Sequence, residues 1–227
     1  MKKLRLLDAS LSNLSTFSSL LPIAACLFKL RKINRRLYAI AVYCAYSLCS
    51  DLSLKYLHLK AYPHSQYFIL TLFTIVEYST FSLYIYYSLS SKILRLCILF
   101  TSILFISFSI IYYFRNNDNA FDLSASIESL LIIVFCLFYF FEQINTPTTS
   151  IIYSTSAFWI IVGMLFYLSG SLFLFLYVTS LPKNEAFHYW YINNIFNILN
   201  KILFLIAFIL NKDDLSKPLP LQKHSYS

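Results

Sequence analysis

The sequence predicts an all-α membrane protein, built as one bundle of seven transmembrane helices. Of its 227 residues, 59% are hydrophobic and 12% are charged, whereas a soluble domain carries about 25% charged residues. Long apolar blocks recur along the chain, and about 20 such residues are needed to cross a hydrocarbon core of about 30 Å. These blocks are continuously apolar and lack the alternation of transmembrane β-strands. The segments between them are too short to form a soluble domain.

Seven spans follow from these blocks, and together they form a single bundle over residues 1–210. They cover residues 11–28, 37–57, 67–89, 93–114, 123–141, 151–178 and 190–210. Pro63, Pro147 and Pro182 lie in the breaks between spans, because proline cannot continue a helix interior. Only Pro22 falls within a span. The remaining residues, 211–227, form a short polar tail.

The first span is the most polar, because serine and threonine crowd its first half. It can therefore be an interfacial helix, which gives an alternative bundle of six spans. Basic residues precede it, and residues 23–26 loosely resemble the cleavage box of a lipoprotein signal. More basic charge follows the segment than precedes it, so we expect it to be retained as a span.

The distribution of Lys and Arg predicts the orientation of the bundle. Loop 29–36 holds five basic residues, and the next break on the same side and the tail add five more. The opposite loops hold only Lys60, Arg115 and Lys183. Basic loops stay in the cytoplasm, so the N-terminus is predicted outside and the C-terminus inside. The expected location is a bacterial inner membrane, crossed several times.

The composition excludes several classes of function. The two glycines, Gly163 and Gly170, are seven residues apart, which rules out glycine-rich phosphate loops and nucleophile elbows. The five cysteines have irregular spacing and indicate neither a disulfide framework nor a metal site. Three histidines fall in predicted outer loops without a close ligand partner. These patterns predict no cofactor and no metal. The net charge of +8 is explained by the Lys and Arg residues of the cytoplasmic loops, so we also predict no nucleic-acid partner.

Ionisable residues inside spans are costly and mark candidate functional sites. Glu77 and Lys201 share a predicted depth near the middle of the bilayer, on helices that run in the same direction. We hypothesise that they form a contact, which would offset part of the cost of burying each charge. The alternative is that each side chain is satisfied by its own neighbours.

Asparagines of the last span form a polar stripe beside Lys201. Asn193, Asn197 and Asn200 follow the spacing of one helical face, with Asn194 alongside. The stripe predicts either hydrogen bonds between helices or a polar cavity between the third and seventh spans. Glu128 of the fifth span would extend that cavity towards the exterior.

Two further patterns indicate structural rather than functional roles. Asp51 and Lys55 stand four residues apart with the acid first, the favourable order for a helical ion pair. Ser156, Gly163 and Gly170 repeat every seven residues, which places small residues on one face for close helix packing. Because no span has a glycine-broken interior, we expect continuous helices throughout.

Two resemblances add to these expectations. The runs 158–175 and 190–201 resemble a group of small uncharacterised bacterial membrane proteins with about seven helices, some of them associated with sensory histidine-kinase systems. The resemblance implies a similar topology and favours signalling. The seven spans, Glu77 and Lys201 also resemble the plan of microbial rhodopsins, but Asn197 replaces an aspartate four residues before the lysine. Retinal binding is therefore a minor alternative.

The function predicted from the sequence is sensing, signal transduction or support of a membrane partner, without catalysis. No Ser/His/Asp or Cys/His set can be placed at one depth, so an enzyme is disfavoured. A membrane or cytoplasmic signalling protein would carry the output, and loop 29–36 would contact it or the lipid headgroups. The alternative is a small transporter or proton-coupled carrier that uses Glu77 and Lys201.

Overall fold

The computed structural model describes residues 2–29, 34–60, 63–116, 120–145, 153, 155–178 and 183–210. The basic residues 30–33, the tail 211–227 and the side chains of His58, His64 and His188 lie outside the described residues. The described residues contain no strand. Their helices are α1 (Lys2–Ser18), α2 (Leu20–Lys29), α3 (Arg35–Lys60), α4 (Pro63–Ser88), α5 (Lys92–Asn116), α6 (Ala120–Asn145), α7 (Ser156–Val178) and α8 (Lys183–Leu210).

Seven of the described segments are long and apolar enough to cross a membrane, which confirms the predicted helical class and agrees with the seven predicted segments. They are Ser10–Phe28, Arg35–Leu57, Ser65–Ser88, Lys92–Arg115, Leu123–Asn145, Ser156–Leu174 and Tyr191–Leu210. The first combines the end of α1 with α2. Pro63, expected in a loop, is instead the first residue of α4, where a proline is tolerated because its missing N–H has no helical acceptor.

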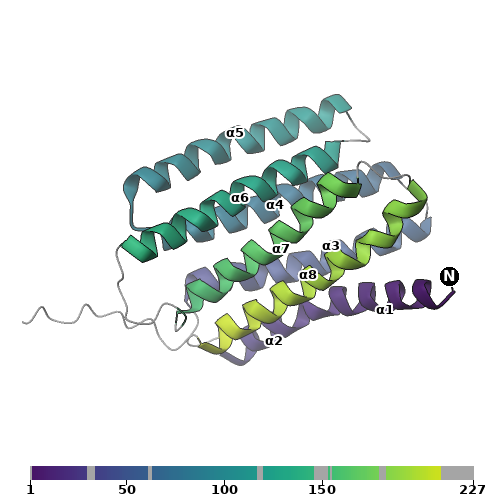
Figure 1. Cartoon of the computed structure of the whole chain (residues 1–227), viewed down its shortest axis with the longest axis horizontal. Helices are drawn as coiled ribbons and strands as arrows, with labels where there is room; N and C mark the ends of the chain where they lie inside the picture. Colours follow the sequence, from purple (N-terminus) through teal and green to yellow (C-terminus); the bar gives the residue numbers. More distant parts are fainter. Residues whose placement is uncertain are drawn as a thin grey trace, which may run out of the picture.

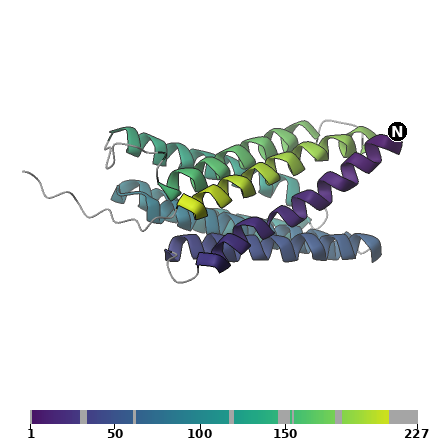
Figure 2. The same cartoon turned by 90° about the horizontal axis from the view of Figure 1, so that it is seen from below.

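The helices lie side by side along one axis, and each runs in the direction opposite to the one before it (Figure 1), α1 and α2 counting as one. The most extensive contact joins α7 and α8, followed by those of α6 with α7 and α3 with α4. Viewed from below, α1 and α2 cross over α3 and α8 (Figure 2), the helices that they contact. Helix α5 lies at the edge against α4 and α6.

The two halves of the bundle have different interiors. One half, which we call the apolar half, lies beyond Glu77 and is filled by large apolar side chains. These side chains belong to residues around 37–44, 78–89, 132–139, 160–164 and 203–208. The ring centroids of Tyr43 and Phe81 lie 4.8 Å apart, and those of Phe81 and Phe204 lie 6.3 Å apart. Such aromatic pairs contribute about 0.5–1.5 kcal/mol beyond the area they bury. The other half, which we call the polar half, holds buried hydroxyl and carboxyl groups around 47–55, 67–77 and 124–129.

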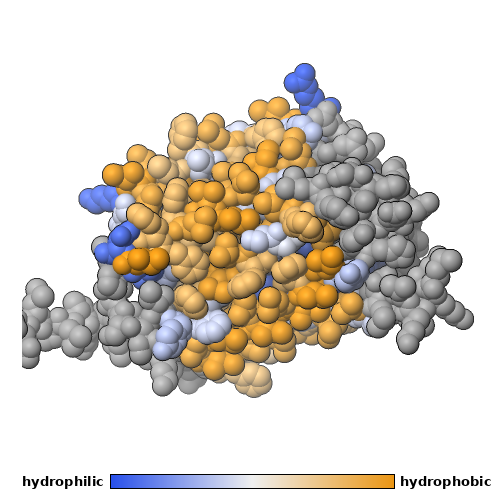
Figure 3. All heavy atoms as spheres, in the orientation of Figure 1, coloured by the Kyte–Doolittle hydropathy of each residue, from blue (hydrophilic) through white to orange (hydrophobic). Residues whose placement is uncertain are grey.

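The outer surface of the bundle is apolar. In Figure 3 hydrophobic residues cover most of the described surface, and the strongly hydrophilic ones lie towards its edges. On α5, for example, Leu96, Phe100, Ile103 and Phe114 are all more than half exposed. An exposed apolar surface of this extent is unfavourable in water, and it suits contact with lipid chains. This is the second observation that supports a multi-pass membrane protein.

The first span is broken, which corrects the prediction of continuous helices. Helix α1 ends at Ser18, Ser19 forms a turn and α2 starts at Leu20. Pro22 has no N–H for the carbonyl of Ser18, and its ring would clash with that carbonyl in a continuous helix. In the last turn of α1, the Ser18 hydroxyl donates to the Ser15 carbonyl at 2.6 Å. The scarcity of glycine does not reveal this break, because it occurs at a proline.

The short connection between α4 and α5 is fixed by two side chains. The Glu142 carboxylate of α6 accepts the backbone N–H groups of Ser90 (2.5 Å) and Ser91 (3.0 Å) at the start of α5. Arg95 donates from Nε to the Leu89 carbonyl at 2.7 Å. A carboxylate at a helix N-terminus satisfies free N–H groups and favours the helix dipole. Glu142 therefore has a structural role at the end of the bundle opposite the start of α1.

Candidate functional site

A polar cavity of about 620 Å³ lies in the polar half of the bundle. Helices α1, α3, α4, α6, α7 and α8 all contribute to its wall. Apart from Leu54, Leu70, Phe73, Ala125 and Leu168, every lining residue is polar or ionisable. The polar residues are Ser12, Ser15, Thr16, Ser47, Ser50, Asp51, Lys55, Tyr67, Thr74, Glu77, Glu128, Ser129, Tyr167, Ser171, Asn193, Asn194 and Asn197. Its volume falls within the roughly 300–1,000 Å³ of small-molecule sites.

Helical spacing places these residues on one face of each helix. On α3, Ser50 and Asp51 follow Ser47 by three and four residues, and Lys55 follows Asp51 by four. The cavity residues of α4, from Tyr67 to Glu77, recur in the same way. Side chains three or four residues apart share a face of an α-helix. Each helix therefore turns a polar face towards the cavity, while the rest of its surface is largely apolar.

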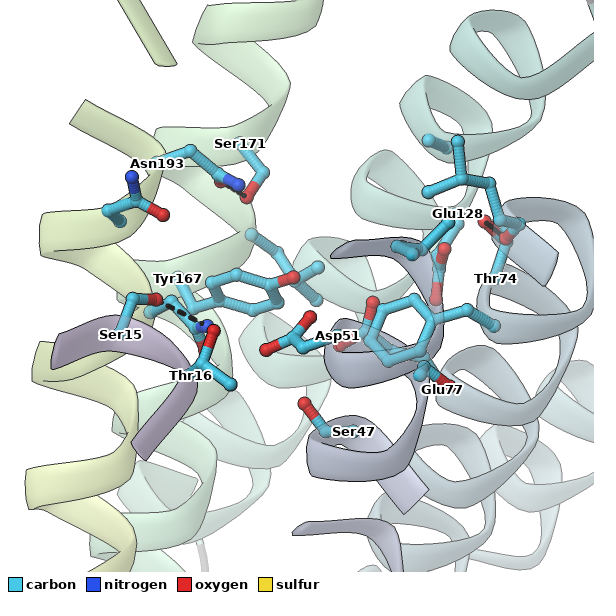
Figure 4. A pocket seen from close by; sticks show the side chains of 18 of the residues that line it. Ser15, Thr16, Ser47, Asp51, Thr74, Glu77, Glu128, Tyr167, Ser171 and Asn193 are labelled. Atoms are coloured by element: carbon cyan, nitrogen blue, oxygen red, sulfur yellow. Dashed lines mark hydrogen bonds between the residues drawn. The ribbon is translucent and has the colours of Figure 1, made fainter. Parts of the chain in front are cut away.

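Three carboxyl groups from three different helices face the cavity. Figure 4 shows Asp51 of α3, Glu77 of α4 and Glu128 of α6 around the same space. Glu77 is within electrostatic range of the other two. Glu77 is 4% exposed and Glu128 is 2% exposed, whereas Asp51 is partly exposed. Burying a carboxyl group is costly unless it is paired or hydrogen-bonded, so the partners of each group decide what the cavity can bind.

The two buried glutamates have unequal partners. The Tyr43 hydroxyl donates a hydrogen bond to Oε1 of Glu77. Oε1 of Glu128 is buried and has no hydrogen-bond partner among the described residues. Buried polar atoms in proteins are nearly always paired with protein groups or ordered solvent. Oε1 of Glu128 is therefore a buried oxygen without a partner among the described residues, on a residue that lines the cavity.

Amide and hydroxyl groups of α8 connect the helices around the cavity. Asn197 donates from Nδ2 to Oγ of Ser15 at 2.9 Å, which joins α8 to α1. Ser171 donates to Oδ1 of Asn193 at 3.0 Å, which joins α7 to α8. Both pairs line the cavity. Asn193 and Asn197 of the predicted stripe thus make hydrogen bonds between helices and also form part of the cavity wall.

Lys55 does not form the predicted pair with Asp51. Its Nζ donates to Oδ1 of Asn13 at 3.0 Å and approaches the Ser12 carbonyl at 3.5 Å. The side chain therefore ties α3 to α1. Lys55 is thus turned towards α1, while Asp51 faces the cavity (Figure 4).

Lys201 and Asn200 do not line the cavity. Lys201 is fully buried, and its Nζ has no hydrogen-bond partner among the described residues. Nζ lies 4.6 Å from the centroid of the Tyr43 ring and 5.9 Å from that of Phe204. The hypothesised Glu77–Lys201 contact is therefore not formed. Tyr43 lies between the two residues: its hydroxyl donates to the Glu77 carboxylate, and its ring face contacts the Lys201 ammonium. Such a cation–π contact is worth about 2 kcal/mol when desolvated.

The small residues of α7 face α8. A Cβ atom added at Gly163 would lie 2.9 Å from Oδ1 of Asn200, and one at Gly170 would overlap the ring of Phe196. Ser156, the first residue of α7, is also buried. The glycines allow α8 to approach α7 closely enough for the Ser171–Asn193 hydrogen bond to form, so they help to position the cavity wall.

Of the candidate polar cluster, the structure brings Glu77, Glu128, Asn193 and Asn197 together at the cavity. Sequence reasoning did not assign Asp51, Tyr167 or the hydroxyl groups of α1 and α3 to the site, and it interpreted Asp51 as the partner of Lys55. The spacing of Ser47, Ser50 and Asp51 on one face of α3 was a usable signal for part of this set. No group of three or more His, Cys, Asp or Glu among the described residues could hold a metal ion.

Comparison with known proteins adds no relative. No protein family, no curated protein and no solved structure matches this chain. The described residues form a helical bundle with seven segments long and apolar enough to cross a membrane and with a polar cavity in one half. The function must therefore be argued from the cavity itself.

Proposed function

We propose that this chain is a multi-pass membrane receptor that binds a small polar solute in the cavity and passes the signal to a partner protein. One observation carries the proposal. Apart from Glu77, which lies at the middle of its span, the lining residues of all six helices fall in the half of each span that the predicted topology assigns to the outside. The cavity would then receive solutes from outside the cell.

The apolar half supports a receptor rather than a channel or carrier. Directly beyond Glu77, the fully buried side chains of Tyr78, Phe81, Ile132 and Phe204 fill the bundle interior. Apolar packing at this density offers no hydrogen bonds to a polar solute or to water. Asn200 and Lys201 are also buried in this half, but no α4 residue beyond Glu77 lines the cavity. We therefore favour binding without passage over transport.

The signal would be transmitted by a change in the arrangement of the helices. Six helices line the cavity, so a bound solute contacts most of the bundle and can favour one arrangement of the helices over another. The output would reach a membrane or cytoplasmic signalling protein on the side of loop 29–36. We propose no catalytic role for the cavity.

A second candidate function is a small carrier, and one observation favours it. The first span is broken at Ser19, close to the cavity residues Ser15 and Thr16. Discontinuous helices form the substrate sites of many transporters. In that case Tyr43 would connect Lys201 to Glu77 as part of a relay. A carrier would have to open the apolar half, which distinguishes it from the receptor.

Accessibility of Ser47 from each side of the membrane tests the proposal. In a variant whose native cysteines are replaced, Ser47→Cys places a thiol in the cavity wall, and Ser109→Cys places one at a buried position of α5 outside it. A membrane-impermeant methanethiosulfonate reagent is expected to modify the thiol at position 47 from the outside only, and not the thiol at 109. The measurement is the rate of modification in intact cells and in inside-out vesicles.

Each of the other outcomes contradicts a specific part of the proposal. Modification of position 47 from both sides would contradict the receptor and support the carrier. Modification from the cytoplasmic side alone would contradict the orientation. Equal, slow modification at positions 47 and 109 would show that the cavity admits no solute, and the proposal would fail.

A further inference from the structure

We infer that the ligand of the cavity is a small organic ammonium ion. This inference rests on the proposed binding function and specifies the chemistry of the solute. Its basis is the combination of charged groups, an unpaired buried oxygen and aromatic rings around a cavity that is too large for a bare metal ion.

The charges that face the cavity are mainly acidic. Asp51, Glu77 and Glu128 line it, and Lys55 is its only lining cation among the described residues. The Lys55 ammonium already donates to Asn13 on α1. The second ammonium nearby, that of Lys201, lies over the Tyr43 ring and does not line the cavity. A cation would therefore meet carboxyl groups, whereas an anion would meet no free positive charge.

The Glu128 carboxyl supplies the clearest contact for such a ligand. Its Oε1 is buried without a hydrogen-bond partner in the described part of the chain, and the residue lines the cavity. An ammonium N–H donates to a carboxylate in a short, strong hydrogen bond. Binding would thus satisfy an acceptor that the protein leaves unpaired.

Aromatic rings add a second form of recognition. Tyr67, Phe73 and Tyr167 line the same cavity, and Figure 4 shows Tyr167 beside Asp51 in its interior. Aromatic faces attract ammonium groups through their quadrupole. The described acids are not close enough together to hold a metal ion, while the volume of about 620 Å³ fits an organic molecule.

Three four-carbon probes that differ in charge test the inference. The purified full chain in lipid nanodiscs is titrated by calorimetry with butane-1,4-diamine, butane-1,4-diol and succinate. We expect the diamine to bind at least about ten-fold more tightly than the other two, which corresponds to about 1.4 kcal/mol. Glu128→Gln is expected to weaken diamine binding by about ten-fold or more.

Glu142→Gln is the matched control, because it makes the same change on α6 at the end of the helix remote from the cavity. Diamine affinity should survive it. If Glu128→Gln does not fold, Asp51→Asn at the partly exposed part of the cavity provides the same test. Equal losses in the cavity variant and in Glu142→Gln would overturn the inference, because the effect would then be indirect.

The binding results separate this inference from the proposed function. Equal binding of the diol, tighter binding of succinate or no binding of the diamine would each overturn the ammonium ligand. If position 47 is still modified from the outside in such a case, the receptor proposal stands with a ligand of different charge. If position 47 is closed to the reagent, the proposed function fails as well.

Discussion

Replacing Gly170 with leucine is expected to destabilise the bundle by about 3 kcal/mol or more. Even a Cβ atom at this position would overlap the ring of Phe196 on α8, and overpacking in a close-packed interior costs about 1–3 kcal/mol, occasionally more. The affected contact, between α7 and α8, is the most extensive in the described bundle. The measurement is the free energy of unfolding in mild detergent.

Two further variants show whether the loss comes from this contact. Ser169→Leu places the same side chain on the exposed side of α7 and should leave stability nearly unchanged. Phe196→Ala should restore part of the stability when combined with Gly170→Leu, because it removes the ring that the leucine would overlap. If Gly170→Leu is no more destabilising than Ser169→Leu, the close approach of α7 and α8 is wrong.

The second large effect is expected where Tyr43 meets Glu77. Tyr43→Phe should cost about 1.5–3 kcal/mol, because it removes the hydroxyl that donates to a buried carboxylate. In a Glu77→Met background the same change should cost little, since the acceptor is already absent. A double-mutant cycle of unfolding free energies measures this coupling.

A parallel cycle compares this contact with the hypothesised ion pair. Lys201→Met and Glu77→Met should couple less strongly than Tyr43→Phe and Glu77→Met, because Lys201 meets the Tyr43 ring and has no hydrogen-bond partner. The reverse order of the two coupling energies would support a direct Glu77–Lys201 pair and would contradict the placement of Tyr43 between them.

Much of the fold was predictable from the sequence, because span length and apolar composition are local properties. Residues 93–114, for example, are mostly apolar with one charged residue, Arg95, and the structure has the single helix Lys92–Asn116 there. The break in the first span was not predicted. It depends on one proline, Pro22, together with hydroxyl groups that can bond to the backbone.

The site was predictable only in part, for a physical reason. Glu77, Glu128 and the asparagines of α8 stand out because polar groups are costly in an apolar span. Asp51 also stood out, but its spacing from Lys55 suggested a local pair. The structure turns Lys55 towards Asn13, which lies 42 residues away in sequence. Which helix faces which is a long-range property that no local pattern contains.

The most direct test of the cavity is to fill it. Ser47→Phe points a large side chain into the cavity (Figure 4), whereas Ser109→Phe forces the same ring into a buried position of α5 outside it. If the cavity exists, Ser47→Phe should change the free energy of unfolding by less than about 1 kcal/mol, and Ser109→Phe should cost about 1–3 kcal/mol through overpacking. Equal and large losses in both variants would contradict a polar cavity in this half of the bundle.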